Sequence, residues 1–234
     1  MRGPQRGALI FGTIILSLAV NGLLGGRIGV VSRSVDVTFS PRSGAFAIWS
    51  AIYPLLCLHA ASQWRTQTAS ESTASESTLD VSAMLLSASL VAAALWVPLF
   101  VRNELWAVVS AAVALHAGFA CAYVALLVLP RATTPVEWTM AQLPLGIFAG
   151  WLLVAAFLTT CIALKMRGWS LPEWLPLVAA IGGAIAAIAA RSPEFAAAQV
   201  WAFAWSPGAW SGMSRTIASL GFAGALTRVV FLGR

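Results

Sequence analysis

The sequence predicts an all-α polytopic membrane bundle with seven or eight transmembrane helices. Its composition is 59% hydrophobic and only 9% charged, with a mean hydropathy of +0.85. Soluble domains carry roughly 25% charged residues, so most of this surface must face lipid. Apolar stretches also recur at about the 20 residues that cross a bilayer. They are roughly 7–26, 44–64, 81–101, 105–129, 142–165, 173–190, 195–212 and 216–232.

The first apolar stretch has two interpretations. Arg2 and Arg6 precede it, as in the charged region of a signal peptide. The apolar run continues to Leu24, however, and a cleavage-site pattern is poor. We therefore expect a retained helix.

The second stretch carries an aromatic face. Phe46, Trp49 and Tyr53 fall at helical spacing on one side. Pro54 has no backbone N–H and so leaves the carbonyl of Ser50 without its helical partner. Rings beside a free carbonyl form a plausible ligand wall, and a kinked helix packed on its neighbours is the plainer alternative.

The connections between the stretches are of two kinds. Residues 66–80 read TQTASESTASESTLD, which is polar, acidic and free of aromatic residues. Such a segment cannot bury enough apolar surface to order itself, so we expect a flexible loop. Residues 102–104, by contrast, join two stretches almost directly, which predicts antiparallel neighbouring helices.

Small residues in the later stretches predict close packing of helices. Gly146 and Gly150 are four residues apart, a spacing that lets backbones approach in lipid. Gly182, Ala186 and Ala190 repeat this spacing in the next stretch.

Polar residues mark where the later helices begin and where one breaks. Thr134 to Glu137 and Ser170 to Glu173 both fit the capping-box pattern. Ser192 precedes a proline at a predicted first helical position. Pro207 interrupts the seventh stretch and is expected to kink or end that helix.

The charges suit a membrane protein better than a nucleic-acid-binding one. The net charge is +6, but the basic residues sit singly at the ends of the apolar stretches. This placement favours contacts with lipid headgroups and no nucleic acid. With eight spans, seven basic residues fall on each side, so the sequence predicts no orientation.

Two histidines are the ionisable candidates inside the predicted spans. His59 and His116 are each expected to hydrogen-bond a neighbouring helix, and axial ligation of a haem or chlorophyll is the alternative. No catalytic or metal-binding motif is recognisable, so we predict no metal site and no enzyme.

Three motifs resemble the TspO/MBR family of translocator proteins and tryptophan-rich sensory proteins. They are Phe39-Ser-Pro41 with the following residues 44–53, then Leu95-Trp96-Val-Pro-Leu-Phe100, then the segment 143–155 around Trp151. The resemblance covers about residues 5–165. It implies a single membrane domain, with a TspO-like five-helix core over 1–165 and additional helices over 166–234, as in the longer branch of the family.

The resemblance implies an intramembrane pocket for a flat hydrophobic ligand, a tetrapyrrole of the porphyrin or haem type or a sterol-like lipid. Such proteins serve sensing, transport or stress regulation. Ala92 to Ala94 and Leu158 to Thr160 replace polar residues of the family pattern, so this pocket should be more apolar. By analogy its walls are Phe46, Trp49, Tyr53, Trp96 and Trp151.

Several alternatives remain open from the sequence alone. The broken seventh stretch motivates a small-molecule membrane transporter, because interrupted helices often mark substrate sites. A membrane enzyme would have to rely on the two histidines. A structural subunit of a larger membrane complex is a further alternative, as is a homodimer. The sequence predicts an integral, multi-pass protein in the lipid bilayer but not which membrane.

Overall fold

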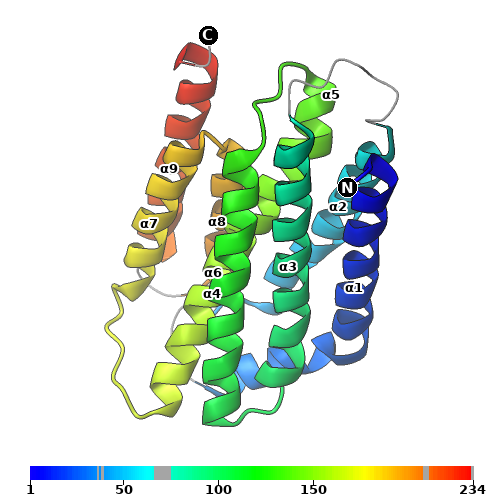
Figure 1. Ribbon diagram of the computed structural model, residues 1–234. Helices are drawn as coiled ribbons and strands as arrows, with labels where there is room; N and C mark the ends of the chain where they lie inside the picture. Colours follow the sequence, from blue (N-terminus) through cyan, green and yellow to red (C-terminus); the bar gives the residue numbers. More distant parts are fainter. Residues whose placement is uncertain (36, 38–39, 66–74, 208–210, 233–234) are drawn as a thin grey trace.

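The computed structural model describes residues 1–35, 37, 40–65, 75–207 and 211–232, and every regular element among them is helical (Figure 1). Two of the elements are a 3₁₀ helix, η1, and a π-helix, η2. In chain order the elements are α1 (Gly3–Ser34), η1 (Ser43–Ile48), α2 (Trp49–Arg65), α3 (Glu76–Phe100), α4 (Leu105–Val128), α5 (Pro135–Glu137), η2 (Trp138–Gln142), α6 (Leu143–Met166), α7 (Leu175–Ala190), α8 (Pro193–Ala204) and α9 (Ser211–Leu232).

The helices form two adjoining groups. In the first, α1 contacts α2 and α3, α3 contacts α4, and α4 contacts α6. In the second, α8 contacts both α7 and α9, and it also packs on α6. Figure 1 shows the long helices of the first group standing side by side. The last three helices therefore join the first group mainly through the α6–α8 contact.

Among the residues that the structure describes, five helical segments are long and apolar enough to cross a membrane. They are Gly3–Ser32, Ser43–Trp64, Glu76–Phe100, Leu105–Val128 and Pro135–Met166. The protein is thus an all-α, polytopic membrane bundle. The remaining predicted stretches are also helical, but α7 has 16 residues and α8 only 12, and α9, with 22, falls outside the candidate spans.

Part of the polar segment 66–80 is helical. Residues 66–74 lie outside the described part of the chain, as does Phe39 of the first family motif. Glu76 already begins α3, and the hydroxyl of Ser75 caps this helix by accepting a hydrogen bond from the amide of Thr78. The acidic residue in the first turn also favours the helix dipole. Helix α3 therefore begins inside the segment whose composition predicted a loop.

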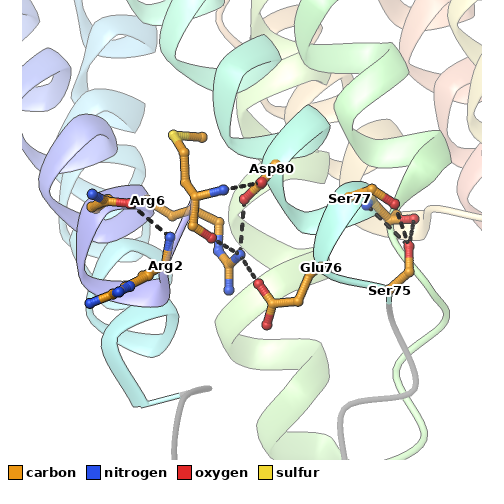
Figure 2. A network of polar contacts seen from close by, with 9 residues as sticks. Arg2, Arg6, Ser75, Glu76, Ser77 and Asp80 are labelled. Carbon is orange, nitrogen blue, oxygen red and sulfur yellow. Dashed lines mark hydrogen bonds and ion pairs between the residues drawn. The ribbon is translucent and has the colours of Figure 1, made fainter.

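The side chain of Arg6, in α1, is buried. Figure 2 shows it paired with the start of α3. Its Nη1 donates to a carboxylate oxygen of Glu76 at 2.5 Å and of Asp80 at 2.9 Å. A buried guanidinium needs such partners, because desolvating an unpaired charge is costly. The charged start of α3 thus ties this helix to the start of α1.

The short connection after α3 confirms the predicted antiparallel pair. Helices α3 and α4 pack along each other. Asn103 between them adopts a left-handed conformation with φ 55°, which asparagine tolerates better than most residues. This turn places the end of α3 beside the start of α4.

Close contacts between backbones explain the predicted Gly146–Gly150 pair. A Cβ added at Gly150 would lie 2.2 Å from the carbonyl oxygen of Phe195, so α8 rests directly on this face of α6. In α7 the packed glycine is Gly183, which abuts the side chain of Gln199, whereas Gly182 meets nothing within 4 Å. In α7 the predicted packing therefore fails at Gly182, whereas Ala190 is buried and Ala186 packs against the core.

The helix caps were predicted correctly at two of three sites. The Thr134–Glu137 capping box is present, and Ser192 accepts a hydrogen bond from the amide of Phe195. The predicted start between residues 170 and 173 is wrong, because α7 begins at Leu175 with Pro176 in its first turn. A proline in the first turn of a helix needs no amide partner. Pro176 therefore favours a helix start at Leu175 over a start at the predicted capping box of Ser170 and Glu173.

Candidate ligand pocket

A small chamber lies inside the first group of helices, walled by aromatic rings. Phe46 of η1, Trp96 of α3 and Trp151 of α6 all line it. The remaining wall comes from α1, α3, α6 and the segment before η1, namely Ile28, Ser32, Pro41, Phe100, Val154, Ala155, Leu158 and Thr159. Three of the five predicted pocket aromatics are thus brought together by three separate elements.

The rings that line the chamber hold one another in place. Phe46 meets Trp151 edge to face, with ring centroids 5.8 Å apart and planes at 84°. On α3, Trp96 lies one turn before Phe100, and their centroids are 5.5 Å apart. Offset and edge-to-face pairs are the favoured aromatic geometries and stabilise the wall beyond simple burial.

The chamber is nearly closed, and a larger hollow adjoins it. The chamber volume is about 20 Å³, which is the space of roughly one water molecule. The adjoining vestibule has a volume of about 700 Å³ and shares Ser32, Pro41 and Phe46 with the chamber. The other vestibule residues are Gly29, Val35, Val37, Ser40, Arg42 and Ser43. Of these two cavities, the vestibule is the one with the size of typical ligand pockets, about 300–1,000 Å³.

Few polar groups face the chamber, whereas the vestibule is partly polar. Ser32 and Ser40 hydrogen-bond each other at 2.6 Å, and Thr159 donates to the carbonyl of Ala155 in its own helix. The indole Nε1 of Trp96 is buried and has no hydrogen-bond partner in the structure. The chamber is therefore mainly apolar, whereas Ser40, Arg42 and Ser43 add polar groups in the vestibule. The Nε1 of Trp96 is left without an acceptor.

Trp49 and Tyr53 are not among the residues that line the chamber. Their rings stack at 5.1 Å, and Trp49 also meets Phe148 of α6 at 6.2 Å. The Tyr53 hydroxyl points to α1, where it accepts from the Nδ2 of Asn21 at 2.9 Å and lies 3.1 Å from the Ser17 hydroxyl. These two predicted residues therefore pack against α6 and α1.

His59 makes a hydrogen bond that joins α2 to η2. Its imidazole is buried at the junction of α2 and η2, and Nδ1 donates to the carbonyl of Met140 at 2.8 Å. The carbonyl can only accept, so Nδ1 carries the proton. His59 is not among the residues that line the chamber.

His116 lies on the outer side of α4, in a groove of about 570 Å³ between α4 and α6. Its Nδ1 donates to the carbonyl of Ala112, one turn earlier in the same helix. The groove also contains Thr160 and, at its end, Arg167. Within the described ranges, no group of three or more His, Cys, Asp or Glu residues could hold a metal ion.

Some of the residues that line the two cavities were not predicted from the sequence. Phe100 follows Trp96 by four residues, so helical spacing alone would have found it. Ser32 and Arg42 come from the end of α1 and the connection before η1. No periodic pattern marks residues of this kind, because their place depends on how the chain turns back.

Comparison with known proteins gives one match. The sequence profile of a family described as TSPO-like protein matches residues 7–232. No curated protein and no solved structure matches the chain. The profile covers all the pocket residues named above as well as the last three helices.

Proposed function

Because the chain belongs to the TSPO-like family, we propose that this integral, multi-pass membrane protein binds a flat hydrophobic ligand in its aromatic chamber and vestibule. The observation that carries the proposal is the convergence of Phe46, Trp96 and Trp151 on one cavity. Three rings from three elements, with almost no polar groups between them, suit the faces of a planar apolar molecule. The protein would bind this ligand in order to sense it or pass it on.

The cavity volumes indicate how such a ligand would lie. A tetrapyrrole or a sterol-like lipid is far larger than the space of about 20 Å³ in the chamber, but the vestibule of about 700 Å³ can take most of it. One edge of the ligand would enter between Phe46 and Trp151 as their contact opens. The proposal therefore requires the segment bearing Phe46 to move on binding.

Two donors set the polarity expected of the ligand. Arg42 lies in the vestibule, where its positive charge favours an anionic edge. Deeper in, the Nε1 of Trp96 needs an acceptor atom. A tetrapyrrole with carboxylate side chains meets both requirements, whereas a sterol-like lipid with a hydroxyl offers the acceptor only.

A titration of the purified protein with protoporphyrin, followed by quenching of tryptophan fluorescence, tests the proposal. Trp96→Phe and Trp151→Phe should each weaken binding about fivefold, the order of magnitude of one aromatic contact. Trp106→Phe is the matched control, because Trp106 is 55% exposed at the start of α4, outside the chamber. Equal affinities in all four proteins would remove the chamber from the binding site.

A comparison of ligands separates the two classes. If Arg42 selects an anionic edge, Arg42→Gln should weaken protoporphyrin binding but leave the dimethyl ester of protoporphyrin unaffected. Binding of cholesterol at the same site would compete with protoporphyrin and would not depend on Arg42. Absence of binding by either ligand would overturn the proposed function.

A further inference from the structure

The end of α8 is hydrogen-bonded to the segment that forms one wall of the pocket. Trp201 donates from Nε1 to the carbonyl of Ala45 at 2.8 Å, across 156 residues of sequence. The amide of Arg42 donates to the carbonyl of Trp205 at 2.9 Å. Both bonds hold the backbone of the short stretch that contains η1.

The same stretch also lies flat against a tryptophan ring. A Cβ added at Gly44 would come within 2.4 Å of the Trp205 ring, so only glycine fits there. The rings of Trp201 and Trp205 are themselves 5.7 Å apart. Residues 42–45 are therefore held by two hydrogen bonds and one close ring contact.

The opposite side of this stretch is the pocket wall. Pro41 and Phe46 line both the chamber and the vestibule. A 3₁₀ helix has poorer internal hydrogen bonds than an α-helix, so bonds from outside contribute more to its position. Contacts made by α8 on one side thus fix where Phe46 lies on the other.

We propose that Trp201 and Trp205 are positioning residues of the ligand pocket. Through them the C-terminal helices hold residues 41–46 where Phe46 contacts Trp151 and closes the chamber. The inference rests on the proposed function for its ligand, but the coupling of α8 to η1 stands on the contacts alone. Ligand entry then requires this stretch to separate from α8.

Trp201→Phe tests the hydrogen bond while keeping a ring. Hydrogen–deuterium exchange of the peptide covering residues 42–48 should become about fivefold faster, as expected for loss of one net hydrogen bond. Association of protoporphyrin should accelerate by a similar factor. Gly44→Ala is a second variant, which displaces the same stretch from Trp205 and should act in the same direction.

Trp64→Phe is the matched control. Trp64 is 44% exposed, close to the 38% of Trp201, and its Nε1 donates to the carbonyl of Pro4 at 2.9 Å, joining α2 to α1 away from the pocket. Its loss should leave exchange at residues 42–48 and the association rate at the wild-type values. Equal acceleration in Trp64→Phe would mean general loosening and would overturn the inference.

The outcomes separate this inference from the proposed function. Wild-type exchange in both Trp201→Phe and Gly44→Ala would overturn the positioning role. Faster exchange with unchanged protoporphyrin kinetics would overturn its link to the pocket. Faster exchange in a protein that binds no protoporphyrin, even as wild type, would support the coupling of α8 to η1 and reject the ligand.

Discussion

His59 donates a hydrogen bond to the carbonyl of Met140. In a regular α-helix this carbonyl would accept from the amide of residue 144, which is a proline. Proline has no N–H, so the histidine supplies the donor that the helix lacks. The contact lies where η2 leads into α6. A residue that resembles a cofactor ligand in the sequence thus supplies a hydrogen bond at the junction of η2 and α6.

We predict that His59→Ala destabilises the protein by about 1–3 kcal/mol, the usual cost of leaving a buried polar group without a partner. Unfolding of the purified protein in mixed micelles would measure the change. His116→Ala is the control, because that side chain is exposed and bonds only its own helix. The absorption spectrum of bound protoporphyrin should be the same in both variants, and a shift in His59→Ala alone would contradict the structural role.

Two glycine substitutions, one at the contact between α6 and α8 and one in open space on α7, should differ in their effect on stability. Gly150→Ala places a methyl group against the carbonyl of Phe195 and should cost about 1–3 kcal/mol, as overpacking does. Gly182→Ala meets open space and should be neutral or stabilise α7 by up to about 1 kcal/mol. Thermal unfolding of the two variants measures the difference. Similar midpoints would show that α8 can move away from α6.

We predict that the stability of the protein depends on pH through Glu194. This residue lies in α8, outside the five candidate spans. Burial raises the pKa of its carboxyl group, although hydrogen bonds from Trp138 and Ser192 and the charge of Arg131 oppose the rise. The folded protein therefore holds this proton more tightly than the unfolded chain. The stabilisation is fully present below the unfolded pKa, about 4.3, and is lost as pH rises through the folded pKa.

Glu194→Gln should remove this contribution. The difference in unfolding midpoint between wild type and Glu194→Gln, followed from about pH 4 to about pH 7, isolates it from other groups. We expect wild type to lose stability relative to the variant as pH rises. A difference that stays constant with pH would mean that the carboxyl titrates normally.

The fold was largely predictable because its main signal is local. Apolar length alone located the helices, since lipid requires every backbone group to bond within its own segment. The burial of Arg6 was not predictable in this way, because its partners Glu76 and Asp80 belong to a stretch whose composition indicates a loop.

The pocket was only partly predictable. The spacing of residues shows which of them share a helical face, but it does not show what that face packs against. Tyr53 shares a helical face with Trp49, yet its hydroxyl bonds Asn21 of α1 instead of facing the cavity. The Trp201–Ala45 bond joins residues 156 positions apart. Contacts at that separation depend on how the last three helices pack on the first group, which no local pattern records.

Filling the chamber tests directly whether it is part of the binding site. Ala155 lines the chamber, whereas Thr160, five residues later on α6, lines the outer groove beside His116. Ala155→Leu adds three carbon atoms to a space of about 20 Å³ and should lower protoporphyrin affinity at least tenfold. Thr160→Leu is a matched change on the same helix and should leave the affinity at the wild-type value. If Thr160→Leu weakened binding and Ala155→Leu did not, the ligand would lie in the α4–α6 groove, and the aromatic chamber would serve packing alone.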